Sequence, residues 1–201
     1  MADASRTSQL EIIGIGVHVV AALTSILTFA DALDRLLVLI VRLQARGISI
    51  RHLDLGGGLC VRYQDENPPE IADYVTTLRR HLADYNLKLI LEPGRSIVAN
   101  NGVLLTRVEY IKHTPHKNFA IVDAAMNDRI RPSLYEAWMD IKPVQPRQAE
   151  ADCYDVVGPV CETSDFLAKD RSLAITEKAL LVVCTAGAYG FAMSTNYKSR
   201  P

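Results

Sequence analysis

The fold is decided by two stretches of sequence, HLDLGGG at residues 52–58 and LKLILEPGR at residues 87–95. In each, a short apolar run typical of a β-strand leads directly into residues with special properties. The three glycines of the first stretch leave their backbone N–H groups open to an anion such as a phosphate. In the second stretch, Glu92 and Arg95 place opposite charges at the end of a strand. Such groups at the carboxyl ends of strands are typical of a phosphate-binding α/β barrel.

The first half of the chain alternates apolar runs with helical patterns. Apolar side chains recur at helical spacing between Leu33 and Leu43, and Gly47 is expected to end that helix. A second helix is opened by Pro68 and Pro69. This order predicts parallel strands joined by right-handed crossovers. The expected elements are strands at 12–17, 52–55 and 87–91, a helix at 29–46, and a helix carrying Ile71, Tyr74, Val75, Leu78 and Leu82.

The pattern changes near residues 96–103, where helical spacing gives way to short runs typical of β-strands. We therefore predict an α/β domain over residues 1–100 and a mainly β domain over residues 101–201. Asp140–Asp152 is expected to be an exposed loop. The other elements expected here are strands at 103–112, 118–122, 154–157, 171–175 and 179–184, and a short helix at 133–139.

Composition excludes several classes of function. The chain has 201 residues, 49% of them hydrophobic, and a net charge of −1. It has no basic tract, which argues against a nucleic-acid partner. Its four cysteines, Cys60, Cys153, Cys161 and Cys184, form no C-x-x-C pair, which argues against a metal site and favours a reducing cytoplasm.

One stretch leaves two interpretations open. Ile12–Ala30 carries no formal charge except on His18 and is long enough to cross a bilayer. It also contains glycines, threonines and a serine, and it runs into the amphipathic pattern of the next helix. A buried strand followed by a helix is favoured over a membrane or signal segment.

Three side chains near the strand ends suit a flat, charged ligand. Glu92 is either an ordinary surface carboxylate or, opposite a pyridine nitrogen, a group that keeps this nitrogen protonated. His18 is either a satisfied core histidine or a ring that stacks on a flat cofactor. Arg95 could bind a carboxylate through two hydrogen bonds.

Two motifs in the second half are further candidates. In Cys161-Glu162 a thiol lies beside a carboxylate, a pair that could donate and accept a proton; a buried structural cysteine is the alternative. Tyr189 lies among the small residues of AGAYG at 186–190. This pattern indicates a ligand close to the backbone, with the phenol reaching a polar partner.

Together these motifs resemble those of the pyridoxal-phosphate-dependent diaminopimelate decarboxylases, members of the alanine racemase/ornithine decarboxylase-like class. The resemblance covers about residues 10–201. It implies an α/β plus β protein, in which a partial (β/α)8 TIM-type barrel with C-terminal strands only precedes an incomplete β-barrel or β-sandwich domain. The matching segments are HLDLGGGL at 52–59, LEPGRSIV at 91–98, VDAAMNDRIRPSLYEAW at 122–138, VGPVCETSDFLA at 157–168 and AGAYGFAMSTNYKSRP at 186–201.

The same resemblance implies a role for each matching residue. Cys161 and Glu162 would enter the site from the second subunit of a homodimer, with Cys161 as the proton donor, and the reaction would convert meso-diaminopimelate to L-lysine. The cofactor, pyridoxal 5′-phosphate, would be bound by Gly56, Gly57, Gly58, Glu92, Gly94, Arg95 and Tyr189, with His18 stacked on its ring. The substrate would be bound by Arg95, Arg131, Tyr135, Glu162 and Tyr189.

Departures from the family pattern lower the expected activity. Family members begin with further barrel strands and carry a Schiff-base lysine there, whereas the first lysine here is Lys88. Ala21 stands where the family has a phosphate-binding serine, unless Ser25 compensates. We expect a fragment that is poorly stable or oligomeric, with low or no activity alone. The alternatives are a non-catalytic remnant that binds a full-length homologue as a heterodimer, and an ornithine/arginine decarboxylase-like enzyme.

Overall fold

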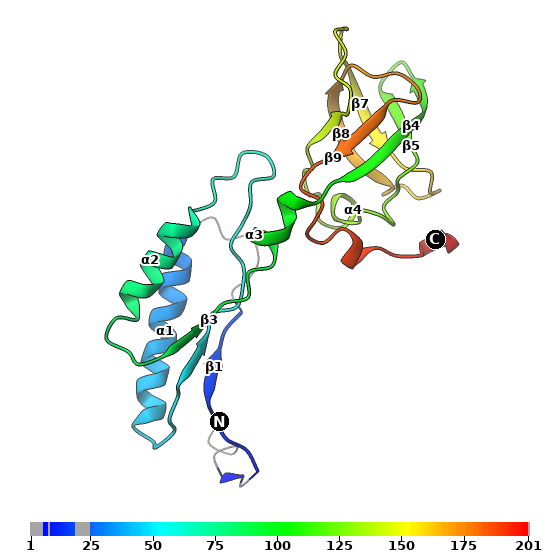
Figure 1. The fold of residues 1–201 in the computed structure, drawn as a ribbon. Helices are drawn as coiled ribbons and strands as arrows, with labels where there is room; N and C mark the ends of the chain where they lie inside the picture. Colours follow the sequence, from blue (N-terminus) through cyan, green and yellow to red (C-terminus); the bar gives the residue numbers. More distant parts are fainter. Residues whose placement is uncertain (1–5, 8, 19–24, 201) are drawn as a thin grey trace. The chain divides into compact units, whose positions relative to one another are not determined.

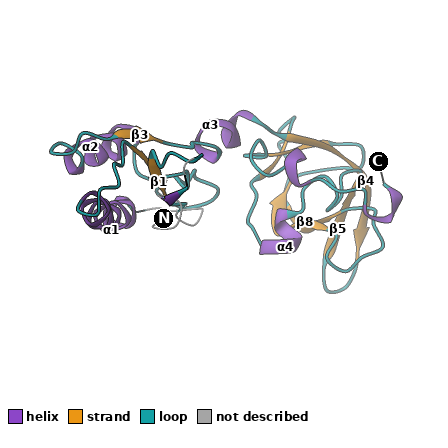
Figure 2. Ribbon diagram, turned by 90° about the horizontal axis from the view of Figure 1, so that it is seen from below, coloured by secondary structure: helices purple, strands orange, loops and turns teal. Residues whose placement is uncertain are grey.

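The computed structural model describes residues 6–7, 9–18 and 25–200 (Figure 1). The chain divides into two compact units, which we describe separately. The first comprises residues up to 62 together with 66–96, and the second comprises residues 63–65 and 97–201. Two long helices lie in the first unit, whereas the second consists mainly of strands and short helices (Figure 2).

The first unit contains a parallel sheet of three short strands in the order β1-β2-β3. These strands are β1 (Gly14–Gly16), β2 (His52–Asp54) and β3 (Lys88–Ile90). Ile15 lies opposite Leu53, and Leu53 lies opposite Leu89. The three predicted strands and their parallel pairing are confirmed, although each strand is shorter than expected.

Helix α1 (Ile26–Gln44) begins three residues before its predicted start, because Ser25 caps it by accepting a hydrogen bond from the N–H of Leu27. Its end is closed by Gly47, whose φ of 79° allows the N–H of Ile48 to reach the Leu43 carbonyl.

Helix α2 (Ile71–His81) lies on the same side of the sheet as α1 (Figure 1). Tyr74 and Leu78 are its buried residues. The expected apolar face is only partly buried, because Ile71 is 62% exposed and Val75 37%. Against the sheet, the two helices bury a core that includes Phe29, Leu33, Ile40, Leu53 and Leu78.

The second unit is one six-stranded sheet in the order β6-β9-β4-β5-β7-β8. Neighbouring strands are antiparallel except β5 and β7. The edge strands β6 and β8 lie close together, so the sheet is nearly closed and is not a sandwich. The strands are β4 (Leu104–His113), β5 (Asn118–Val122), β6 (Ile141–Pro143), β7 (Asp152–Val157), β8 (Phe166–Leu173) and β9 (Leu180–Val183).

Three predictions in this unit are wrong. The segment 140–152 is not wholly a loop, because its first residues form β6 and Ile141 is 4% exposed. Strand β8 begins five residues before the predicted 171. The helix predicted at 133–139 is α4 (Arg131–Tyr135), which has a proline in its first turn and is followed by Glu136 with a left-handed φ of 52°.

The predicted membrane alternative falls partly on residues 19–24, including Ala21, which lie outside the described residues. Within the described ranges, the structure contains no helix that is both long and apolar enough to span a bilayer.

Candidate functional site

The glycine turn after β2 and the carboxylate after β3 lie side by side. Because β2 and β3 are paired neighbours, the segments that follow them run together. The N–H of Glu92 donates to the carbonyl of Gly56 at 2.8 Å. A Cβ atom at residue 57 would lie 2.5 Å from the Glu92 carbonyl oxygen, so Gly57 cannot carry a side chain without a backbone shift. The sequence stretches that predict the site therefore meet in the structure.

His18 lies at the same end of the sheet. Its Nδ1 is 3.5 Å from Glu92 Oε2, and the two side chains are 64% and 57% exposed. Gly56 has a φ of +65°, and a Cβ atom there would lie 2.8 Å from His18 Nδ1. The turn, the imidazole and the carboxylate thus form one open cluster, and His18 is not a core histidine.

Asp54 is a residue of this cluster that the sequence analysis missed. Its Oδ1 accepts a hydrogen bond from the N–H of Gly56 at 2.8 Å. The Asp-x-Gly spacing is typical of an Asx turn and could have identified it. Because the N–H of Gly56 is engaged there, an anion would be bound through Gly57 and Gly58.

The remaining predicted residues of the first unit follow β3. Gly94 has no neighbouring atom within 4 Å of an added Cβ, and Arg95 begins the short helix α3 (Arg95–Val98) and is half-buried. Lys88 begins β3 and lies opposite His52, at the end of the strand away from Glu92. No lysine among the described residues of this unit lies at the glycine turn.

In the second unit, Arg131 and two aromatic rings form a separate group. The guanidinium carbon of Arg131 lies 4.7 Å from the ring centre of Tyr63 and 6.0 Å from that of Tyr189. The Nη1 atom of Arg131 is buried and has no hydrogen-bond partner. A guanidinium held over rings with a free donor can bind a carboxylate. Tyr135 lies on the same helix, α4, and is 60% exposed.

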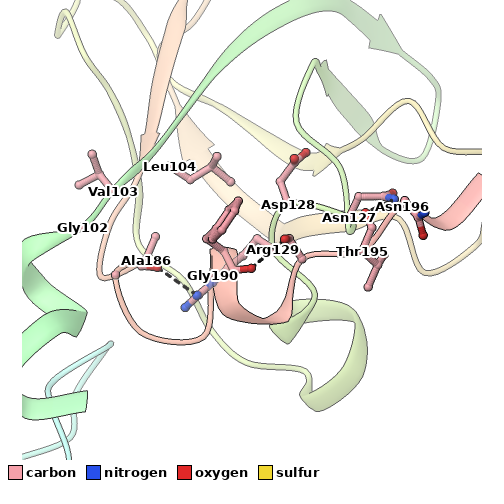
Figure 3. A pocket seen from close by; sticks show the side chains of 13 residues that line it. Gly102, Val103, Leu104, Asn127, Asp128, Arg129, Ala186, Gly190, Thr195 and Asn196 are labelled. Carbon is pink, nitrogen blue, oxygen red and sulfur yellow. Dashed lines mark hydrogen bonds between the residues drawn. The ribbon is translucent and has the colours of Figure 1, made fainter. Parts of the chain in front are cut away.

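Arg129 is a second residue that the sequence analysis missed. It is fully buried, and its guanidinium donates to the carbonyls of Ala188 at 2.7 Å and Thr185 at 3.3 Å. In Figure 3 its side chain points toward the turn at Ala186 and Gly190, at the edge of a cavity of about 910 Å³. Arg129 therefore supports the turn that carries Tyr189.

Cys161 and Glu162 lie on the exposed turn between β7 and β8. Asp165, which is 4% exposed, closes this turn through hydrogen bonds from the N–H groups of Val160 and Met126, both at 2.6 Å. The thiol of Cys161 is free and exposed, so the alternative of a buried structural cysteine is wrong. Among the described residues there is no cluster of three His, Cys, Asp or Glu side chains that could hold a metal.

Known proteins are similar to this chain in sequence and in fold. Residues 17–187 match the family described as pyridoxal-dependent decarboxylase, C-terminal sheet domain. Diaminopimelate decarboxylase of Pseudomonas aeruginosa is 61% identical over 99% of this chain and 48% of its own length. The Vibrio cholerae enzyme of that name is 60% identical over 96% of this chain and 46% of its own.

A solved structure is also similar to this chain. The crystal structure of diaminopimelate decarboxylase from Helicobacter pylori complexed with L-lysine has a TM-score of 0.94 and 38% identity, and it covers 100% of this chain and 50% of its own. The chain spans about half the length of the curated relatives it matches. The match to the family model extends over most of the chain, which therefore belongs to the pyridoxal-dependent decarboxylases.

Proposed function

We propose that this chain is the C-terminal part of a diaminopimelate decarboxylase, which converts meso-2,6-diaminopimelate to L-lysine and CO2 with pyridoxal 5′-phosphate. The observation that carries the proposal is the meeting of Gly57, Glu92 and His18 at one end of the parallel sheet. The names of relatives at 60–61% identity support the same reaction.

The cofactor fits the donors of the first unit. The bare backbone at Gly57 and Gly58 offers N–H groups to a phosphate, and the Glu92 carboxylate would hold a proton on the pyridine nitrogen. Tyr189, of the second unit, is assigned to the phosphate only from the resemblance to the family. His18 would stack on the ring. When bound, the protonated ring supplies an electron sink for the electrons left by departing CO2.

Substrate binding is assigned to the second unit together with Arg95. The unpartnered Nη1 of Arg131 would pair with the carboxylate at the end of the substrate that does not react. Tyr135 and Tyr189 would contribute hydroxyl groups to the same end. A substrate with a second carboxylate uses this donor, whereas ornithine has none there, which favours diaminopimelate over the ornithine/arginine decarboxylase-like alternative.

Protonation after CO2 loss is assigned to Cys161, with Glu162 binding the substrate amine beside it. Both side chains are exposed on their turn, which suits a pair that acts in the site of a second subunit. We therefore propose a homodimer, and the absence of a C-x-x-C pair among the four cysteines supports a place in the cytoplasm. Residues 1–100 would form the last strands of a (β/α)8 barrel, and residues 101–201 would form the C-terminal domain.

The position of the lysines predicts weak, non-covalent cofactor binding by this chain. Lys88 is the only lysine in residues 1–96, and it begins β3 at the end away from Glu92. Borohydride reduction of the chain mixed with pyridoxal phosphate, followed by peptide mapping, tests this. We expect at most scattered labelling of surface lysines. Stoichiometric labelling of one lysine would contradict the proposed low activity.

A second candidate function is a non-catalytic remnant that completes the site of a full-length homologue. The complete and exposed Cys161–Glu162 turn favours it. The test is co-expression with a full-length relative whose own cysteine and glutamate of this motif are replaced by alanine. Recovery of lysine formation with the wild-type chain, but not with Cys161→Ala, would support it. Absence of a heterodimer in size-exclusion chromatography would exclude it.

A chimera in which this chain replaces the matching half of a full-length relative tests the substrate, because its Arg95, Arg131 and Tyr135 then belong to the chain. With diaminopimelate and ornithine compared side by side, we expect turnover of diaminopimelate alone. Preferential turnover of ornithine would replace the proposed reaction with the alternative one.

A further inference from the structure

We propose that Tyr197 is a positioning residue that fixes the Glu162 carboxylate, and that residues 195–200 form a strap across the Cys161–Glu162 turn. The Tyr197 hydroxyl donates to Glu162 Oε2 at 3.1 Å. The next residue, Lys198, donates from Nζ to the carbonyl of Cys161 at 2.5 Å. Consecutive residues of the strap thus hold the consecutive residues of the turn.

Both oxygens of Glu162 are engaged. Oε1 accepts from the N–H of Thr163 at 3.0 Å, while Oε2 accepts from Tyr197. A glutamate on an exposed turn ordinarily samples several rotamers, and two donors on separate oxygens select one orientation. Asp165 accepts a hydrogen bond from the N–H of Val160 in the same turn, and the strap adds a second hold on the turn backbone, at the Cys161 carbonyl, together with control of the Glu162 side chain.

The strap is anchored at its beginning by Asn127, which is 1% exposed. Asn127 Nδ2 donates to the carbonyls of both Thr195 and Tyr197 at 2.9 Å, and the N–H of Thr195 donates to the Asn127 carbonyl at 3.1 Å. Figure 3 shows Asn127 beside Thr195 and Asn196. A buried side-chain amide that donates to two carbonyls of one short segment fixes the backbone of this segment in one conformation.

The end of the strap is anchored as well. Arg200 donates to the carbonyl of Asp123, and its Nη2 lies 3.6 Å from Asp128 Oδ2. Between the anchors, Lys198 and Ser199 have left-handed φ values of 54° and 57°. Non-glycine residues avoid this region, so the contacts on either side must hold the chain there. The backbone path brings Tyr197 and Lys198 onto the turn.

Residues 126–131, with the sequence MNDRIR, have two proposed roles. Asn127 anchors the strap and Arg131, four residues later, carries the proposed carboxylate donor. The catalytic meaning of the strap rests on the proposed function, in which Cys161 and Glu162 act on the substrate. The contacts that form the strap do not depend on the proposed function, because all of them lie within the second unit.

Hydrogen exchange of the full chain, followed by mass spectrometry, tests the proposal without any cofactor. Tyr197→Phe keeps the ring and removes the hydroxyl donor. We expect exchange of residues 158–165 to rise severalfold, with β5 unchanged. Tyr110→Phe, at a tyrosine that is 62% exposed on β4, is the matched control and should leave the turn unchanged. A rise confined to residues 195–200 would mean that Tyr197 holds only its own segment, and it would overturn the proposal.

A conservative pair of variants provides the second test. Glu162→Gln keeps an oxygen that can accept from Tyr197 and should retain slow exchange, whereas Glu162→Leu should lose it. Iodoacetamide labelling, quantified at Cys161 and Cys153 separately, should become faster at Cys161 alone in Tyr197→Phe, because Cys153 lies on β7 away from the strap. Equal exchange rates of residues 158–165 in the two glutamate variants would overturn the proposal. A positive result without cofactor binding would withdraw only the proposed function.

Discussion

At the scale of single residues, short polar side chains fix the segments that carry the site. Asp54 closes the glycine turn, Asp165 closes the Cys161–Glu162 turn, and Asp123 joins β4 to β5. In each case, the carboxylate accepts a hydrogen bond from a backbone N–H group, that of Gly56, Val160 or Arg107. Such bonds orient a turn more tightly than exposed ion pairs do.

The interactions of Asp123 predict that the stability of the fold decreases in acid. Burial raises the pKa of Asp123, but hydrogen bonds from the N–H of Arg107 and the hydroxyl of Thr106, with the charge of Arg107, outweigh it and lower the pKa overall. A lowered pKa contributes stability above the unfolded value of about 3.9 and loses it as the pH falls through the folded value.

We therefore expect Asp123→Asn to be less stable than the wild type at pH 7, with the gap in free energy of unfolding closing below about pH 4. Urea denaturation at a series of pH values measures this gap. A gap that stays constant down to pH 2 would show that the Asp123 pKa is not lowered by folding.

The close surroundings of Gly187 predict that any side chain at this position destabilises the fold. An added Cβ atom would lie 1.9 Å from the carbonyl oxygen of Val98 and 2.9 Å from the nitrogen of Gly102, both of them backbone atoms. Gly187→Ala should lower the free energy of unfolding by about 1–3 kcal/mol, as overpacking does. Gly94→Ala, where nothing lies within 4 Å, is the matched control and should change it little. Equal stability of the two variants in urea would refute the close approach.

At the scale of elements, the parallel strands and both long helices were predictable, because their apolar periodicity agrees with Gly47 after α1 and with the prolines before α2. The short elements were not. Strand β6 was missed because it has three residues, ends in Pro143 and is recognised only through its pairing with β9. The predicted range of α4 was displaced because Pro132 lies in its first turn and the left-handed Glu136 follows its end, whereas the apolar pattern continues to Met139.

Helix α1 predicts a contrast between its two faces. Leu33 is fully buried in the core of the first unit, whereas Val38 is 54% exposed. Leu33→Ala should destabilise the chain by about 2–5 kcal/mol through lost burial and a cavity. Val38→Ala should stay within about 0.5 kcal/mol of the wild type. Urea denaturation followed by far-UV circular dichroism measures both changes in the free energy of unfolding. A large destabilisation by Val38→Ala would mean that this face of α1 is covered.

At the scale of the whole chain, the site residues fall into two sets. Gly57, Glu92 and His18 belong to the first unit, and Arg131 and Cys161 belong to the second. The sequence predicted both sets, since strand ends and motif order locate them. It did not reveal Asp54, Arg129 or Tyr197, whose roles depend on contacts between segments that are distant in sequence or on the geometry of a turn.

Exposed apolar surface predicts self-association. Leu27 is 78% exposed and Phe191 94%, and the strands β1 and β3 form the edges of a parallel sheet. Sedimentation velocity should show association that increases with concentration. A single species of 22.2 kDa at every concentration would contradict this expectation.

The proposed function requires that the glycine turn beside Glu92 bind the phosphate of a pyridoxal compound. Pyridoxamine 5′-phosphate tests it most directly, since it has the ring and the phosphate but no aldehyde to react with surface lysines. Titration calorimetry should show weak binding of this compound, none of pyridoxamine, and loss of binding in Gly57→Ala but not in Val38→Ala, a change on the exposed face of α1. Equal binding of the two compounds, or unchanged binding by Gly57→Ala, would show that the glycine turn does not bind the phosphate.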